Sequence, residues 1–246
     1  MDIAVVFVLG LIIGSFANVI IARVPVGESI VFPGSHCPAC GHSLKAMDLI
    51  PCLSYVALGG HCRYCGGGIS LRYPAVELLN GIIFGLCYLV FGFTWHTLLG
   101  MILSTLAIVI FFIDLDHKII PNKVVLAGLI LLLPVLFLDP AKGIADSLIG
   151  MAVLGGLFFI LCMFGGMGGG DVKLGALLGL VLGWKSGLVC IFIASLVGFL
   201  VGMALRMKGK FERKEQIAFG PFLAIGAMSS FLYGQKLIDW YMSWYR

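Results

Sequence analysis

Charged residues are scarce in this sequence. They make up 11% of its 246 residues, against 61% hydrophobic residues, and the mean hydropathy is +1.10. Soluble domains carry about 25% charged residues, so a soluble globular fold is excluded. The net charge is only +4, and no cluster of basic and aromatic residues indicates nucleic acid as a partner. The composition therefore predicts a membrane protein in contact with lipid.

A cleavable secretory signal is also missing. The first hydrophobic stretch has only Asp2 before it and lacks a basic start and a small-residue cleavage site, so we expect it to remain as a helix. Runs long enough to cross about 30 Å of hydrocarbon number about eight. They are residues 3–22, 74–92, 96–113, 122–138, 144–164, 171–185, 187–205 and 217–236. We predict an all-α polytopic membrane protein with about eight transmembrane helices.

The basic residues orient these helices. With eight spans and the N-terminus in the periplasm, twelve Lys and Arg lie on one side and four on the other. Short cytoplasmic loops are enriched in basic residues, so the richer side is the cytosol. The run at 171–185 is short enough to be re-entrant, but removing it would move the basic segment 206–216 outside. We interpret that segment as a face attracted to anionic membrane lipid.

Two pairs of cysteines predict a metal site. Cys37 and Cys40 form one C-x-x-C knuckle, Cys62 and Cys65 form another, and 21 residues separate the knuckles. This spacing is close to that of a structural zinc ribbon, in which two intervening residues aim both thiolates at one ion. The reducing cytosol disfavours disulfides there. We predict that residues 23–73 form a small cytosolic domain with four cysteine ligands to zinc.

The other cysteines and the nearby histidines rank lower as ligands. Cys87, Cys162 and Cys190 lie in apolar runs and are interpreted as packing residues, whereas Cys52 is ambiguous. Four thiolates already fill a tetrahedral shell. The histidines that flank the knuckles are therefore interpreted as non-ligands, and they are His36, His42 and His61.

A few carboxylates stand where a predicted helix meets the membrane boundary. Asp114 ends the third run, and Asp171 opens the sixth run on the same side, after the glycines Gly168, Gly169 and Gly170. Ionisable groups near membrane depth are functional candidates. Two neighbouring carboxylates that share a proton supply a general base and a general acid. This pair would activate a water molecule for attack on a peptide carbonyl.

Several alternatives stay open at this point. Asp171 could simply cap its helix. Asp116 points about 200° away from Asp114 on a continuous helix, so it is a helper or a solvated charge. Lys173 could bind a substrate carbonyl, lower a pKa, or extend to the membrane interface. Asp139 and Asp146 fall at the periplasmic boundary and are interpreted as structural.

With these residues in view, the chain resembles the prepilin peptidases, a family of bifunctional type IV leader peptidases and N-methyltransferases. Besides the knuckles, the motifs that carry the resemblance are Gly14-Ser15-Phe16-Ala17-Asn18-Val19, Arg23-Val24-Pro25, Leu49-Ile50-Pro51, Ser54-Tyr55, Arg72-Tyr73-Pro74-Ala75-Val76-Glu77, the two aspartate segments and Phe219-Gly220-Pro221-Phe222-Leu223-Ala224. Ala218 departs from the proline expected there. The Gly-x-Gly-Asp element also resembles presenilin-type proteases, although Ile113 replaces their tyrosine.

The resemblance implies both an activity and its residues. It places the two catalytic aspartates on Asp114, seven residues before Pro121, and on Asp171. It implies cleavage at the cytosolic face of the bacterial inner membrane, after a glycine that ends a short basic leader of a type IV prepilin or type II secretion pseudopilin. Methylation of the new N-terminal amine with S-adenosylmethionine would follow. No glycine-rich strand-turn-helix for this methyl donor is evident, so its binding residues are unassigned.

We expect three parts: a first transmembrane helix at 1–22, the zinc domain at 23–73 and the protease core at 74–246. Two other functions compete with this interpretation. An ion-coupled transporter would need inverted repeats and midplane carboxylates. A membrane scaffold with a zinc docking domain would leave the glycine run at 165–170 unexplained.

Overall fold

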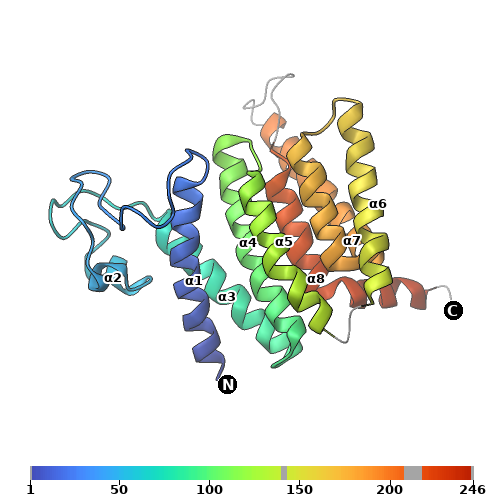
Figure 1. Ribbon diagram of the computed structural model, residues 1–246, viewed down its shortest axis with the longest axis horizontal. Coiled ribbons are helices and arrows are strands. Elements are labelled where there is room, and N and C mark those ends of the chain that lie inside the picture. The colour runs from blue at the N-terminus through green and yellow to red at the C-terminus, as the bar shows by residue number, and fades with distance from the viewer. Residues whose placement is uncertain (1, 140–142, 208–217, 245–246) are drawn as a thin grey trace. The chain divides into compact units, whose positions relative to one another are not determined.

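The protein is helical throughout the part that the structure describes. The computed structural model describes residues 2–139, 143–207 and 218–244, and these ranges contain helices and isolated bridges but no strand element (Figure 1). The chain divides into two compact units, Met1–Phe93 and Thr94–Arg246. Five of the described helices are long and apolar enough to cross a membrane, and Asn122–Leu138 is a shorter apolar helix. The prediction of an all-α membrane protein is confirmed, while the number of eight spans stays a prediction.

The first unit is a helix pair with a long loop segment between its members. Its elements are α1 (Ile3–Arg23), η1 (Ala46–Leu49), α2 (Leu53–Ala57) and α3 (Arg72–Phe91). The pair packs closely because a Cβ on Gly10 would lie 2.7 Å from Cα of Gly81, and one on Gly14 would lie 2.8 Å from Cα of Glu77. Small residues permit such close packing of helices in lipid. Asn80 adds a hydrogen bond to the carbonyl of Gly10 at 2.8 Å.

The second unit is a bundle whose longest helix is broken. Its elements are α4 (Trp95–His117), α5 (Asn122–Leu138), α6 (Ile144–Met163), α7 (Gly169–Met207) and α8 (Gly220–Ser243). Gly183 in α7 has φ 77° and ψ 172°, a conformation outside the helical region. Before this break, α7 runs antiparallel to α6, since Gly179 lies against Gly150 and Ala176 against Gly155.

After the break, α7 runs antiparallel to α8. Gly198 lies against Phe222, and the Ser230 hydroxyl donates to the carbonyl of Ser186. Gly183 therefore separates a stretch that runs along α6 from a stretch that runs along α8, although Gly187, just beyond the break, still lies against Leu154 of α6. The predicted boundary between the runs at 171–185 and 187–205 falls close to this break.

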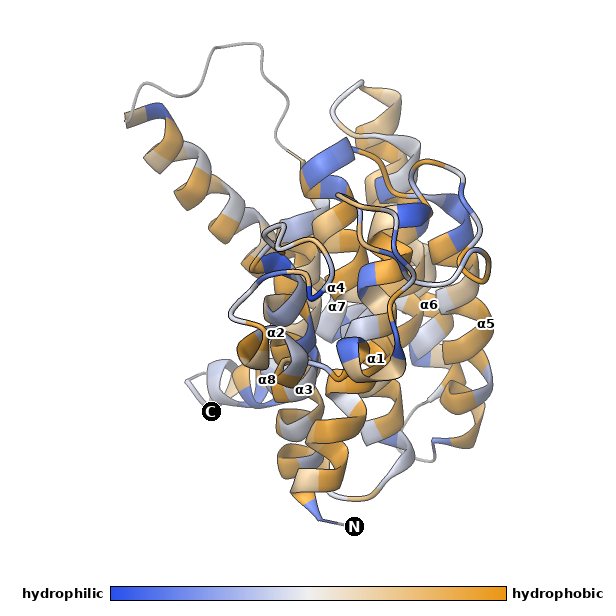
Figure 2. Cartoon of the chain, turned by 90° about the vertical axis from the view of Figure 1, so that its left-hand side faces the viewer, coloured by the Kyte–Doolittle hydropathy of each residue, from blue (hydrophilic) through white to orange (hydrophobic). Residues whose placement is uncertain are grey.

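The hydropathy of the surface fits a bilayer. Figure 2 shows hydrophobic residues along the lengths of the helices, and many large apolar side chains are exposed.

The last predicted run began at residue 217, which lies outside the described residues, and α8 extends to Ser243. Of the predicted basic segment 206–216, only the first two residues lie within the described ranges.

Candidate active site and metal centre

Asp114 lies in the last turn of α4. The helix ends at His117, and the next residue, Lys118, has a left-handed φ of 54°. The Asp114 carboxylate is buried, with 5% of the residue exposed. Its Oδ2 accepts a hydrogen bond from the backbone N–H of Gly220 at 2.8 Å. A carboxylate at the end of one helix is thus held by the first residue of another.

Asp171 lies in the first turn of α7. Its Oδ2 accepts a hydrogen bond from the backbone N–H of Gly168 at 3.1 Å, which closes the start of the helix. A Cβ on Gly170 would lie 2.9 Å from Cβ of Ile120, whereas one on Gly169 would meet nothing within 4 Å. Gly170 therefore lets α7 start against the connection between α4 and α5. Asp171 is thus the third residue of α7 and not its N-cap, and its carboxylate reaches back to the residue before the helix.

Asp114 and Asp171 lie on different helices, at ends that approach one another. Each is about one helical turn from a residue that lines the same small cavity, Ile110 in α4 and Leu174 in α7. For both residues, the hydrogen bond from a glycine N–H within the described segments engages Oδ2. The Oδ1 atoms are then the oxygens that can take a water molecule or a shared proton. Asp116, by contrast, is exposed on α4.

Lys173 contacts an amide. Its Nζ donates to Oδ1 of Asn122 at 2.8 Å, which joins the first turns of α7 and α5. Lys173 is exposed, and neither a substrate nor a lipid contact is needed to explain its position. Asn122 has no role predicted from the sequence, although its place directly after Pro121 marks the start of a helix.

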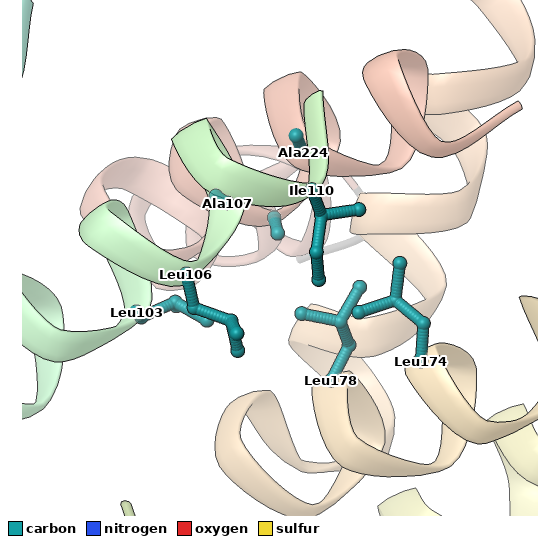
Figure 3. Close-up of a pocket in the computed structure, with 8 residues that line it drawn as sticks. Leu103, Leu106, Ala107, Ile110, Leu174, Leu178 and Ala224 are labelled. Atoms are coloured by element: carbon teal, nitrogen blue, oxygen red, sulfur yellow. The ribbon is translucent and has the colours of Figure 1, made fainter. Parts of the chain in front are cut away.

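The core below the carboxylates is apolar. Ile110 and Leu174 lie about one helical turn from Asp114 and Asp171 and help to line a small cavity of about 10 Å³ (Figure 3). A space of this size holds at most about one water molecule, and its walls offer no polar partner. It is a packing gap among α4, α7 and α8, and it keeps this side of the site dry. The lining residues are Leu103, Leu106, Ala107, Ile110, Leu174, Leu178, Ala224 and Ala227.

The first unit brings four cysteines together. The Sγ atoms of Cys37, Cys40, Cys62 and Cys65 all lie within 4.8 Å of one another, and those of Cys37 and Cys65 are 3.9 Å apart. Zinc bound tetrahedrally at about 2.3 Å from each sulfur sets neighbouring sulfurs about 3.8 Å apart. The donor set and its spacing therefore fit a metal ion.

Both knuckles have the same backbone conformation. Gly41 N–H donates to the carbonyl of Cys37 at 2.8 Å, and Gly66 N–H donates to that of Cys62 at 2.9 Å. These glycines have φ of 68° and 69°, which a residue with a Cβ adopts only at a cost. The glycine after each C-x-x-C closes the turn that aims the thiols. Hydrogen bonds from the N–H groups of Cys40 and Ala39 lower the pKa of Cys37 to about 7, which favours the thiolate.

The flanking histidines have other partners. His36 Nδ1 lies 3.1 Å from the carbonyl of Gly34, and His61 Nδ1 lies 2.7 Å from that of Gly59. The ring of His42 packs on Tyr64 with ring centroids 3.7 Å apart. Among the described residues, the cluster consists of the four cysteines alone.

Two buried polar side chains fix the loop segment to the helix pair. Arg23, at the end of α1, donates to the carbonyls of Ser29, Pro33 and Gly34 at 3.0, 2.7 and 3.2 Å. These hydrogen bonds offset the free-energy cost of burying the Arg23 side chain and the three carbonyls. The loop is therefore tied directly to the last turn of α1.

The second of these side chains is Glu77 of α3. Its Oε2 accepts the backbone N–H of Cys52 at 2.8 Å, and the Cys52 thiol lies 3.6 Å from the same oxygen. Cys52 has a left-handed φ of 58°. Burial and the charge of Glu77 raise the pKa of the Cys52 thiol to about 11. The ambiguous cysteine of the sequence analysis is thus a partner of Glu77, a contact that the sequence spacing gave no means to find.

These features describe a helical membrane protein with a paired carboxylate site, as in a membrane aspartic peptidase, and a separate four-cysteine cluster. Residues 8–91 match the Bacterial Peptidase A24 N-terminal domain, and residues 101–203 match the Type IV leader peptidase family. The chain belongs to the type IV leader peptidase family.

Relatives similar to the chain carry the name prepilin leader peptidase/N-methyltransferase. The Bacillus subtilis protein is 33% identical over 97% of this chain and 97% of its own length, and the Pseudomonas aeruginosa protein is 34% identical over 95% and 91%. The Myxococcus xanthus protein is 42% identical over 81% of this chain, but this alignment spans only 62% of that relative. No solved structure matches the chain.

Proposed function

We propose that this chain removes the short basic leader from type IV prepilins or type II secretion pseudopilins and then N-methylates the new N-terminal residue. Membership of the family supports both activities. The observation that carries the peptidase assignment is the pair Asp114 and Asp171. Asp114 ends α4 and Asp171 lies in the first turn of α7, each about one turn from a residue that lines the same small cavity, and the glycine N–H that each carboxylate accepts engages Oδ2, which supports a shared site.

The two aspartates divide the chemistry of hydrolysis. One carboxylate takes a proton from a water molecule, and the oxygen of this water attacks the scissile carbonyl. The protonated partner carboxyl group donates its proton to the carbonyl oxygen. The tetrahedral intermediate then breaks its C–N bond: the carboxyl group that took the water proton gives it to the amine nitrogen, and the other carboxylate takes back the proton from the hydroxyl group as the C=O bond forms again. The products are the leader with a free carboxylate and the pilin with a free amine.

The placement of this site supports cleavage at the cytosolic face of the inner membrane. Asp114 ends α4 and Asp171 begins α7, on the side that the basic residues assign to the cytosol in the eight-span topology. A substrate with a basic leader and an apolar helix would leave its helix in the lipid and present its leader there. Lys173 and Asn122 mark the same edge of the bundle.

Zinc is the metal that the four cysteines favour. Cys37, Cys40, Cys62 and Cys65 would hold it with no open position, which is the coordination of a structural site. Zinc would order the loop domain at 23–73, which along the chain follows a first helix at 1–22 and precedes the core at 74–246. Binding energy of this kind is folding energy for a small loop domain.

S-adenosylmethionine would supply the methyl group for the second activity. The hollow of about 340 Å³ between α1 and α3 does not fit this donor, because it is lined by Ile3, Ala4, Phe7, Ile82, Gly85, Leu86 and Leu89, which offer no polar side chain. A sulfonium and an adenine need polar partners. We therefore assign no donor-binding residues.

Mass spectrometry of a co-expressed pilin tests the proposed function directly. With this protein present, we expect the N-terminus to begin after the leader and to carry one added methyl group. A pilin that keeps its leader in the presence of correctly inserted protein would contradict the proposal. A cleaved but unmethylated pilin would contradict its second half alone.

A further inference from the structure

The segment Phe219-Gly220-Pro221-Phe222 has no role in the chemistry described so far. In the structure, it forms the start of α8 and reaches Asp114, more than a hundred residues away in the sequence. Gly220 is buried, and its N–H donates to Oδ2 of the buried Asp114 at 2.8 Å.

The first turn of α8 leaves this N–H available. A helix start has N–H groups without partners inside the helix. Phe222 and Leu223 donate to the carbonyl of Phe219, at 3.1 and 3.0 Å, and Pro221 has no N–H to donate. In this described turn, the N–H of Gly220 is the donor that remains, and Asp114 accepts it.

The carboxylate of Asp114 explains why residue 220 is a glycine. A Cβ at position 220 would lie 2.6 Å from Oδ2 of Asp114, which is closer than real Cβ atoms approach, and 3.0 Å from its Cγ. The backbone of Gly220 does not have a positive φ, so its conformation alone does not require glycine. Gly168 is the equivalent partner of Asp171. A Cβ on Gly168 would lie 3.4 Å from Oδ2 of Asp171, which is an ordinary contact distance.

The start of α8 is itself held firmly. The ring of Phe219 lies 6.2 Å from that of Phe158 in α6 and 6.3 Å from that of Phe222, between ring centroids. Phe222 also packs on Gly198 of α7. The donor for Asp114 is therefore fixed by aromatic packing on two other helices.

We propose that Gly220 is a positioning residue for peptide hydrolysis. Its N–H holds Oδ2 of Asp114, and its missing side chain leaves room for the carboxylate, so that Oδ1 stays available to the catalytic water. A displacement of about 1 Å at such a group costs up to about 100-fold in rate. The inference rests on the proposed role of Asp114.

The test compares Gly220→Ala with Gly156→Ala, a helical glycine at which a Cβ meets nothing within 4 Å. The assay follows cleavage of a synthetic segment with a basic leader, a glycine and an apolar helix. For Gly220→Ala we expect kcat to fall about 10- to 100-fold with KM within about twofold. Gly156→Ala should keep the parent kcat. A parent kcat in Gly220→Ala would overturn the inference.

Asp114→Asn separates this inference from the catalytic role on which it rests. If Asp114→Asn cleaves at the parent rate, that role of Asp114 is wrong, whereas a parent protein that leaves the leader uncut would overturn the proposed function itself. If Asp114→Asn is inactive and Gly220→Ala is fully active, only the positioning role is wrong.

A second measurement, of Tm, tests the inference even if Gly220→Ala folds poorly. Gly220→Ala should lower Tm by several degrees in the parent, but much less in an Asp114→Ala background, because the carboxylate that the new Cβ strikes is then gone. An equal loss of Tm in both backgrounds would overturn the inference, since the clash would lie elsewhere.

Discussion

The two units of this protein are ordered by different interactions. Between α1 and α3, the chain of the first unit contains only short helices, and its order comes from Arg23, from Glu77 and from four thiols. In the second unit, long apolar helices pack through glycines, and its polar pair lies at the helix ends. A loop with a four-cysteine cluster and a rigid helical bundle should respond to mutation independently, so we expect methylation to depend on the loop at 23–73 and hydrolysis on the aspartates of the second unit.

The largest expected effect is on the carboxylate pair. Asp114→Asn and Asp171→Asn should each reduce cleavage about 100-fold or more, because a lone carboxylate has no partner for the shared proton. The measurement is the rate at which leader-free pilin appears, read by mass spectrometry. Asp116→Asn is the matched control and should keep measurable activity. An inserted Asp171→Asn protein that cleaves at the parent rate would remove Asp171 from the site.

The next effect would separate the two activities. Glu77→Ala removes the acceptor for the N–H of Cys52 and loosens the loop segment, so methylation should fall about 10-fold or more, since a lost buried hydrogen bond costs about 1–3 kcal/mol. Cleavage should stay within about twofold. The ratio of methylated to unmethylated mature pilin is the readout, and Leu78→Ala, at an exposed neighbouring position, is the control. Equal losses of both activities in folded protein would indicate one shared site.

Metal removal gives a further contrast between the units. We expect about one zinc per chain in the parent and none in the double variant Cys37→Ser, Cys62→Ser, as measured by elemental analysis. The loop should become disordered because zinc supplies its folding energy, while the helical bundle keeps its circular dichroism signal. Cys162→Ser, outside the cluster, should retain zinc. Stoichiometric zinc in the double variant would rule out this ligand set.

The smallest effect concerns packing in the second unit. A Cβ on Gly150 would meet the backbone of Gly179 and Gly183, so Gly150→Ala should lower the free energy of unfolding by about 1–3 kcal/mol. Gly156→Ala, in the same helix and facing open space, should change it little. Denaturant unfolding in detergent measures both. Zinc content should be the same in the two variants, and a loss of zinc in Gly150→Ala would contradict the independence of the units.

Much of the fold could be predicted because apolar runs and glycine positions act locally. The hydrophobic runs gave helices, and the C-x-x-C-Gly spacing gave two turns that repeat in the structure. The role of Cys52 could not be predicted, since its partner Glu77 is 25 residues away and no local pattern links them. The zinc, the catalytic roles and the count of eight spans remain predictions.

The sequence by itself determined the membrane class, the cysteine knuckles, and the two aspartate segments as candidates, because these depend on composition and on spacing within a few residues. Only the tertiary structure decided which other residues contact these candidate residues. Gly220 and Asp114 meet because α8 starts where α4 ends, and Lys173 meets Asn122 because two helices begin together. Such contacts depend on how distant helices pack, and periodicity within one segment carries no information about that packing.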